Sequence, residues 1–531
     1  MWQITKPQIF LLACGAFTLR AIISLQSYSG FNKPPMYGDF EAQRHWQEVT
    51  INLPIADWYT NTSDNDLMYW GLDYPPLTAY HSFINGWVAQ KLNASYVELH
   101  TSRGITTEEH HNFMRNTVLV ADFLLYIPAL IIAVKSIGLQ WHPILSLLSL
   151  IVVLFYPGQI IIDNGHFQYN NISLGFAALA IAAIFRKSER LAAVLFVLAL
   201  NYKQMELYHA LPFFLYLLGH SFTSSKQKST SFSQRCVAAV KNVAILGLIV
   251  LFSFALIWAP WLRSIHHLKQ LLHRLFPVAR GVFEDKVSNV WCVVNVFYKL
   301  KMHFTNEQMA IACLISTLIA ILPSSIHLLL NPRKEAFLLS LINSALAFFL
   351  FSFQVHEKSI LLVTLPVMLY FRMDPLCALW FLHIATFSML PLLVLDQLIY
   401  PTVVLTSIYL MLIRVAIRWS VNDEKTTKLP LWDVLSLSSI SDNKLFVGIF
   451  YMSTFVGCSL LVVGQVFVRP PNSLPFLFPL LISAYSCAHF VLFFIYFNIR
   501  QIFGGATVKI DNVQRVTRKT TSRVATNKKS N

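Results

Sequence analysis

The densest group of side chains capable of acid–base chemistry lies between about residues 37 and 81. This segment places Asp39, Glu41, Arg44, His45 and Asp73 among aromatic residues and prolines. A solvated loop is normally rich in Gly, Ser, Asn and Lys instead. A carboxylate can deprotonate a hydroxyl, and neighbouring cations can stabilise a departing anion. The segment therefore predicts a folded site for group transfer.

Further polar groups recur where apolar stretches end, and an ionisable group beside lipid is costly unless it pairs or faces water. The candidate site residues among them, with the tyrosine that follows Asp73, are Tyr74, Asp163, His166, Gln168, Lys203, Glu206, His356 and Lys358. The cations expected to face an anionic substrate group are Lys203, Arg274, Arg280, Lys286 and Lys358. We expect these groups to converge on one cavity, because the predicted membrane spans place them on one side of the membrane.

The composition predicts an all-α polytopic membrane protein. Hydrophobic residues make up 55% of the chain and charged residues 13%, whereas soluble domains carry roughly 25% charged residues. The basic residues lie between apolar stretches and in the tail, as the positive-inside rule requires. Spans are expected at about 7–26, 117–136, 143–161, 171–185, 190–202, 205–219, 242–260, 308–330, 336–353, 358–371, 375–395, 398–418, 445–466 and 475–499. This gives about fourteen membrane helices, with short amphipathic helices expected in the loops on the far side.

The topology divides the chain into three predicted regions. Residues 1–260 form a catalytic transmembrane module with a lumenal loop at 27–116, and residues 261–508 form a second module with a lumenal loop at 261–307. Residues 509–531 form a basic cytosolic tail, which we expect to be disordered.

Two weak signals favour the endoplasmic reticulum membrane. Lys528 and Lys529 lie near the end of the chain like a dilysine retrieval signal. Asn61 and Asn93 begin glycosylation acceptor triplets in the first lumenal loop.

Several enzyme classes lack their required motifs. The sequence contains no Walker A loop, no Gly-rich dinucleotide turn, no HExxH and no Gly-x-Ser-x-Gly. The seven cysteines are scattered without metal-ligand spacing. Carboxylates with Arg, Lys and His beside lipid remain, and this set suits transfer of a group from a lipid-linked anionic donor. We expect no metal cofactor, because Arg and Lys could take the place of a metal beside a departing monophosphate.

Several long motifs, in order, resemble one known family. They are GDFEAQRHW, NLPI, DWY, YWGLDYPPLTAY, DNGHFQYNN, NYKQMELY, LFPVARGVFEDKVSNVWC and FQVHEKSIL. These stretches are similar to the ALG glucosyltransferases of the endoplasmic reticulum, which are dolichol-linked enzymes with the GT-C glycosyltransferase fold. The resemblance extends to about residue 400, and no residue beyond that point is assigned a role.

The resemblance implies a specific reaction. Gln43–Trp46 and Tyr69–Pro76 look like the members that move the first glucose from dolichyl-phosphate-glucose to Man9GlcNAc2-diphosphodolichol in α-1,3 linkage. The donor is β-linked, so the reaction inverts the anomeric carbon and needs a base on the face opposite the leaving phosphate. The family's base corresponds to Asp39, its members of this class need no metal, and His356 would contact the donor phosphate or sugar.

Alternative interpretations of these residues stay open from sequence alone. Asp39 could cap a helix, Asp73 could set a turn before the prolines, and His166 could be purely structural. Lys203 and Glu206 could form a helical salt pair. Asp122 and Asp396 are interpreted as structural partners.

Other functions also remain open. The alternatives are the second glucosyltransferase of this pathway, another dolichol-phosphate-sugar-dependent transferase, or a secondary transporter.

Overall fold

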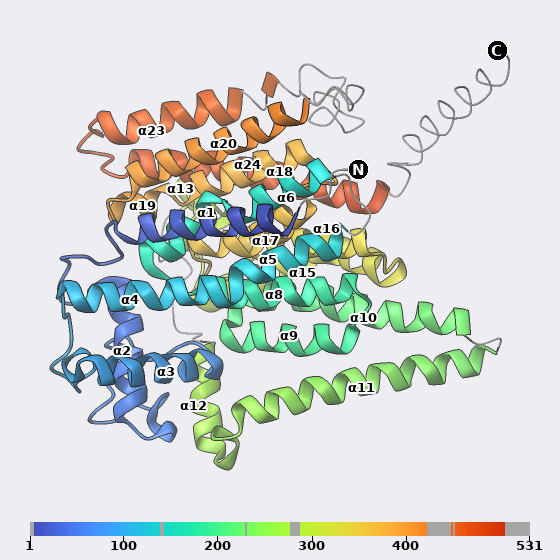
Figure 1. Ribbon diagram of the computed structural model, residues 1–531, viewed down its shortest axis with the longest axis horizontal. Helices are drawn as coiled ribbons and strands as arrows, with labels where there is room; N and C mark the ends of the chain where they lie inside the picture. The colour runs from blue at the N-terminus through green and yellow to red at the C-terminus, as the bar shows by residue number, and fades with distance from the viewer. Residues whose placement is uncertain are drawn as a thin grey trace.

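The computed structural model describes residues 5–138, 143–228, 231–276, 287–421, 448–449 and 452–504. Within these ranges all regular structure is helical, and no strand occurs in them. Most helices run side by side along one direction and form a single bundle (Figure 1). The predicted all-α polytopic architecture is confirmed.

Helices occupy every interval that the hydropathy pattern predicts as a span. They are α1 (Lys6–Ser24), α4 (Glu108–Ala121) with η3 (Asp122–Tyr126) and α5 (Ile127–Ile137), α6 (Pro143–Leu154) with α7 (Pro157–Ile160) and η4 (Ile161–Phe167), α8 (Asn170–Phe185), α9 (Glu189–Tyr202), α10 (Leu207–Lys228), α11 (Phe232–Trp258), α15 (Asn306–Leu330), α16 (Lys334–Phe351), α17 (Ile360–Tyr370), α18 (Pro375–Ser388) with α19 (Leu390–Leu395), α20 (Ile399–Val421), η9 (Met452–Gly457) with α23 (Cys458–Phe467), and α24 (Leu477–Phe503). In the described part of the chain, 9 helices are long and apolar enough to cross a membrane. The remaining intervals hold shorter or less apolar helices, so the count of about fourteen crossings is not confirmed.

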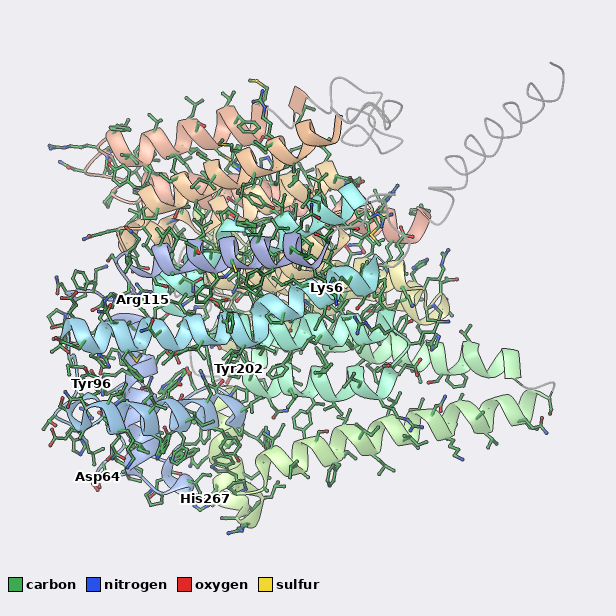
Figure 2. All side chains as sticks on the ribbon, in the orientation of Figure 1. Lys6, Asp64, Tyr96, Arg115, Tyr202 and His267 are labelled. Atoms are coloured by element: carbon green, nitrogen blue, oxygen red, sulfur yellow. The ribbon has the colours of Figure 1, made fainter. Side chains whose placement is uncertain are left out.

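The two predicted lumenal loops supply the shorter elements at one end of the bundle. They are α2 (Gly38–Asn52), η1 (Ile55–Asp57), α3 (Pro76–Leu92), η2 (Ala94–Tyr96), η6 (Trp261–Arg263), α12 (Ile265–Leu275), α13 (Val290–Phe297) and α14 (Leu300–His303). Figure 2 shows Asp64, Tyr96 and His267 gathered at that end, whereas Lys6, at the start of α1, lies towards the other end. The two loops therefore share one side, as the topology requires.

The main hydrophobic core runs through both predicted transmembrane modules. It joins residues as distant in sequence as Ala16 and Phe497. A second cluster includes Trp46, Trp261 and Leu271 and packs α2 against α12. The boundary between residues 260 and 261 stays a prediction, and the tail from residue 509 lies outside the described residues.

A buried ion pair joins α1 to the helix that follows the first lumenal loop. Arg20 Nε lies 3.3 Å from Asp122 Oδ1, and Asn164 Nδ2 donates to the other carboxylate oxygen at 2.8 Å. Inside a bilayer, such charges persist when they are paired and hydrogen-bonded. Asp122 therefore has the structural role expected from the sequence.

Candidate active site

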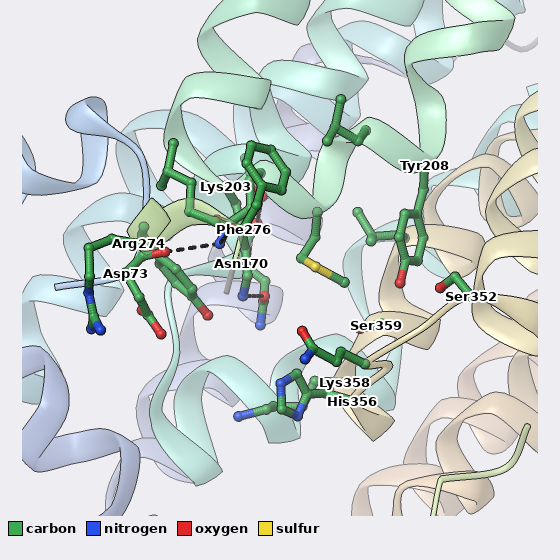
Figure 3. A pocket seen from close by; sticks show the side chains of 18 of the residues that line it. Asp73, Asn170, Lys203, Tyr208, Arg274, Phe276, Ser352, His356, Lys358 and Ser359 are labelled. Atoms are coloured by element: carbon green, nitrogen blue, oxygen red, sulfur yellow. Dashed lines mark hydrogen bonds between the residues drawn. The ribbon is translucent and has the colours of Figure 1, made fainter. Parts of the chain in front are cut away.

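A cavity of about 630 Å³ lies where the shorter elements of residues 27–116 and 261–307 meet the bundle. Its walls come from α2, the loop before α3, the η4–α8 connection, α8, η5 (Gln204–Glu206), α10, α12, α15, α16, η7 (Glu357–Ser359) and α17. Figure 3 shows Asp73, Lys203 and Arg274 on one side, Tyr208 and Ser352 on another, and His356 beside Lys358. The cavity thus collects residues from most of the polar groups that the sequence singles out.

Asp39 is the most heavily engaged carboxylate on the cavity wall. Its Oδ2 accepts hydrogen bonds from His166 Nε2 at 2.8 Å and Gln168 Nε2 at 2.7 Å, and it forms an ion pair with Lys358 Nζ. No described residue donates to Oδ1, and the side chain is 24% exposed. One oxygen is fixed by three donors, and the other remains able to accept a proton from a bound molecule.

A tight turn before α2 sets the position of Asp39. Tyr37 and Gly38 both have positive φ, at 54° and 63°, a region that glycine adopts freely and tyrosine rarely. Ser29 joins this turn to η4, because its Oγ accepts from Asp39 N at 3.1 Å while its own N–H donates to His166 O at 2.9 Å. Asp39 does not cap α2, since the N-cap residue is Tyr37. The capping interpretation is therefore wrong.

The wide π-helical turn η4 and a strained residue after it supply the partners of Asp39. Phe167 has φ of 84°, and the chain leaves the helix there, so that Gln168 turns back to Asp39. Such turns and strained residues recur at functional sites. Asp163 stabilises the connection by accepting bonds from Gln159 and Asn170 side chains at 2.7 Å each. Asp163 does not line the cavity.

His166 bridges two carboxylates. Its Nε2 contacts Asp39, and its Nδ1 lies 2.5 Å from Oδ2 of Asp396, in the turn after α19. Each of these contacts requires a proton between the ring nitrogen and the carboxylate oxygen, because the lone pairs of the two atoms would otherwise repel. His166 is 1% exposed and does not line the cavity, so it contacts Asp39 from behind the cavity wall.

The ionisation of Asp39 is controlled by its neighbours. Burial opposes the charged form, but the Lys358 ammonium and His166 outweigh it and hold the pKa of the Asp39 carboxyl well below its usual range. Asp39 is therefore an anion at neutral pH.

Further cations line the cavity away from Asp39. Lys203 Nζ donates to Asn170 Oδ1 at 2.5 Å and lies 4.9 Å from the centre of the Tyr74 ring. Arg274 donates to the carbonyls of Gly71 and Leu72 at 2.6 and 3.1 Å. These bonds join α12 to the loop that carries Asp73. The cavity therefore presents Lys203, Arg274, His356 and Lys358 to one bound molecule.

The alternative interpretation of Lys203 and Glu206 as a salt pair is wrong. Glu206 Oε2 instead lies 2.8 Å from His209 Nδ1, and Glu206 is outside the cavity wall. Arg280 and Lys286 lie outside the described residues.

The opposite face of α2 carries a buried charge network that does not line the cavity. Arg44 donates to Glu41 Oε1 and Glu48 Oε2 at 2.6 Å each, and to Ser102 Oγ at 2.6 Å. His45 Nδ1 lies 3.2 Å from Glu48. Although burial alone would raise the pKa of the Glu48 carboxyl, the His45 hydrogen bond and the Arg44 charge lower it to about 2. Glu41, Arg44 and His45 therefore belong to a charge network that stabilises α2 and its surroundings. The α2 residues on the cavity wall are Asp39, Ala42, Gln43 and Trp46.

Two residues of this arrangement were not predicted as site residues. Gln43 lies one turn after Asp39 on the cavity wall. Its spacing of four residues from Asp39 indicates the same face of a helix, so the sequence alone could have identified it. Asp396 was assigned a structural role only, and no local pattern connects it with His166. It lies 230 residues further along the chain.

The apolar part of the cavity reaches the outer surface of the bundle. Leu314 and Leu318 of α15 line it and are 59% and 52% exposed, and Phe348 of α16 lies on the same wall. A chain inside the cavity could therefore extend into lipid. A polar cavity with this apolar extension is typical of a membrane-embedded transferase acting on a lipid-linked substrate.

Comparison with known proteins identifies the family. The model of the ALG6, ALG8 glycosyltransferase family matches residues 16–496, so this chain belongs to that family. It is 48% identical over 496 residues to the probable dolichyl pyrophosphate Man9GlcNAc2 alpha-1,3-glucosyltransferase of Drosophila melanogaster, covering 93% of this chain and 98% of the relative. It is 45% identical to the mouse (Mus musculus) dolichyl pyrophosphate Man9GlcNAc2 alpha-1,3-glucosyltransferase, covering 93% and 96%. The Saccharomyces cerevisiae enzyme of that name is 42% identical, over 74% of this chain and 71% of its own length.

Proposed function

We propose that this protein transfers glucose from dolichyl-phosphate-glucose to Man9GlcNAc2-diphosphodolichol in α-1,3 linkage. The observation that carries the proposal is a fixed carboxylate, Asp39, on the wall of a cavity that also presents Lys203, Arg274 and Lys358. The names of the relatives give the acceptor and the linkage. Membership of a glycosyltransferase family rejects the transporter alternative.

In the proposed reaction, Asp39 is the general base. Its free Oδ1 accepts the proton of the acceptor hydroxyl, the hydroxyl oxygen bonds to the anomeric carbon of glucose, and the bond from that carbon to the phosphate oxygen breaks. Dolichyl phosphate leaves, and the configuration inverts. An anionic phosphate beside Lys358 would offset the charge that lowers the pKa of Asp39. Donor binding would thus raise this pKa towards the reaction pH and make Asp39 a better base.

The cations of the cavity would hold the departing phosphate. Lys203, Arg274 and Lys358 line the cavity, and His356 is a further hydrogen-bonding group on its wall. A low-dielectric cavity strengthens such charge pairs. The dolichyl chain would follow the apolar wall formed by α15 and α16 into the bilayer.

We further propose that the protein resides in the endoplasmic reticulum membrane with the cavity in the lumen. Asn61 and Asn93 are exposed at the end of the bundle that carries the cavity, as glycan acceptors must be. Lys528 and Lys529 lie outside the described residues.

The function is tested by supplying the wild-type protein in membranes with dolichyl-phosphate-glucose and either Man9GlcNAc2 or Glc1Man9GlcNAc2 lipid. We expect glucose transfer to the first acceptor only. Transfer only to the second acceptor would establish the second-glucosyltransferase alternative.

Metal removal is expected to leave activity unchanged. Because we propose that Lys and Arg stabilise the leaving phosphate, no divalent cation is required for that step. Glucose transfer should be equal, within twofold, in the presence of excess EDTA and in the presence of Mg²⁺ or Mn²⁺. Loss of transfer with EDTA, restored by one of these ions, would contradict the metal-independent mechanism.

Replacing Asp396 with asparagine is expected to lower kcat by up to about 10²-fold, the cost of misplacing a catalytic group by about 1 Å. The variant removes the charge that faces His166 Nδ1, so His166 would hold Asp39 less firmly. The KM values for donor and acceptor should change little, because Asp396 does not line the cavity. Unchanged kcat in a variant with the wild-type unfolding temperature would show that the His166–Asp396 contact has no positioning role.

A further inference from the structure

Three glutamines line the cavity with hydrogen-bonding capacity that the described protein does not use. Gln43 comes from α2, Gln168 from the η4–α8 connection and Gln204 from η5. These elements are far apart in sequence, so the fold brings these three neutral amides to a cavity whose wall also carries Asp39, Lys203 and Lys358.

Gln43 is the clearest case. Its side chain is 4% exposed, lies on the cavity wall and forms no hydrogen bond with any described residue. Gln47, one turn further along α2, is 1% exposed, but its amide donates to the Met114 sulfur at 3.2 Å and it does not line the cavity. Gln47 Oε1 is also buried without a partner, so these two buried glutamines of one helix differ in that only Gln43 lines the cavity.

Gln168 and Gln204 are each half-satisfied. The Gln168 amide donates to Asp39 at 2.7 Å and the Gln204 amide to the Asp73 carbonyl at 3.0 Å. The Oε1 atom of each is buried without a protein partner. Most buried polar side-chain atoms have a partner, so two free acceptors and one free amide at the same cavity need an explanation.

We propose that Gln43, Gln168 and Gln204 form the subsite that binds the hydroxyls of a pyranose. An amide both donates and accepts, as does a sugar hydroxyl, whereas the cations of the cavity match a phosphate. Gln168 places the subsite against Asp39, and Gln43 lies about 6 Å from Asp39 along the axis of α2. A pyranose whose reacting atom lies beside Asp39 presents other hydroxyls at that range. The inference rests on the proposed function and names the part of the site that holds the sugar.

The sugar could be the glucose of the donor or the terminal mannose of the acceptor, which share this chemistry. The two sources are separated by measuring the KM of donor and acceptor independently, each with the other substrate saturating. We expect Gln43→Leu to raise one of them by about tenfold, the effect of losing one well-formed hydrogen bond. A rise in the donor KM assigns Gln43 to glucose, and a rise in the acceptor KM assigns it to mannose.

Gln47→Leu is the matched control, because it removes an equally buried amide from the same helix outside the cavity. It should leave both KM values within twofold of wild type. The proposal would be overturned if folded Gln43→Leu kept both KM values within twofold of wild type. It would also be overturned if Gln47→Leu raised a KM value as much as Gln43→Leu does.

A second measurement does not depend on how the variants fold. Wild-type protein is assayed with donors and acceptors that each lack one hydroxyl of the glucose or terminal mannose. We expect at least one deoxy substrate to have a KM about tenfold higher, with no further rise in Gln43→Leu where that variant folds. No effect from any deoxy substrate would overturn the subsite. Absence of turnover with the complete substrates would instead reject the proposed function.

Discussion

Replacing Asp39 with asparagine should lower kcat for glucose transfer by about 10²–10⁴-fold, the usual contribution of a general base. Asparagine keeps the size of the side chain and can still accept hydrogen bonds from His166 and Gln168, but it cannot take a proton from the acceptor hydroxyl. The loss should therefore lie in kcat, with little change in KM for either lipid. Radiolabelled glucose transfer in membranes measures both constants.

Asp64→Asn is the matched control for this variant, because Asp64 lies in the same segment between α1 and α4 with a side chain that is 54% exposed. It should retain wild-type turnover. If folded Asp39→Asn keeps more than about a tenth of wild-type turnover, the base is another group. Asp73 would then be the next candidate, since it is the other carboxylate that the sequence analysis placed in the site and the structure places on the cavity wall.

The helices were predictable because membrane spans have a strong compositional signal. Each predicted interval contains a helix, since an apolar segment in lipid must satisfy its backbone hydrogen bonds internally. The number of crossings was harder to predict, because α9 and α17 have only 14 and 11 residues.

Asp39 was predictable from its residue type and its place after the first span, but its neighbours on α2 were not correctly assigned. Positions 39, 42, 43 and 46 face the cavity, and positions 41, 44, 45 and 48 face away from it. Helical spacing separates these two sets. It does not say which set faces the substrate, because both contain polar residues, and the packing of α2 against η4 and α3 decides it.

The contacts of His166 with Asp396 and of Lys358 with Asp39 bridge 230 and 319 residues. Such pairings depend on how the helices pack together. Sequence alone can mark the residues as costly in a membrane, but it cannot pair them.

The second large effect is expected from Arg44→Met, on stability rather than chemistry. Arg44 is buried between Glu41 and Glu48, and removing one partner of a buried ion pair costs about 3–5 kcal/mol. Local opening of the segment 27–107 should therefore become roughly 10²- to 4 × 10³-fold more frequent. Limited proteolysis of that segment reports how often it opens, provided that the segment recloses faster than the protease cleaves it.

Removing the partner charges of Arg44 distinguishes unpaired charge from lost packing as the cause of the Arg44→Met effect. Adding Glu41→Gln and Glu48→Gln to Arg44→Met removes the unpaired carboxylates, so the triple variant should regain much of the lost protection. Lys91→Met, at an exposed position of α3, should leave proteolysis unchanged.

The pH response supplies an independent check, because the pKa of Glu48 is about 2 in the folded protein and about 4.3 in an unfolded chain. In wild type its stabilising contribution is complete above about pH 4.3 and is lost as the pH falls towards 2. If Arg44→Met is cleaved at the wild-type rate, the network does not stabilise the lumenal fold. If the triple variant is cleaved as fast as Arg44→Met, the cause is lost packing rather than unpaired charge.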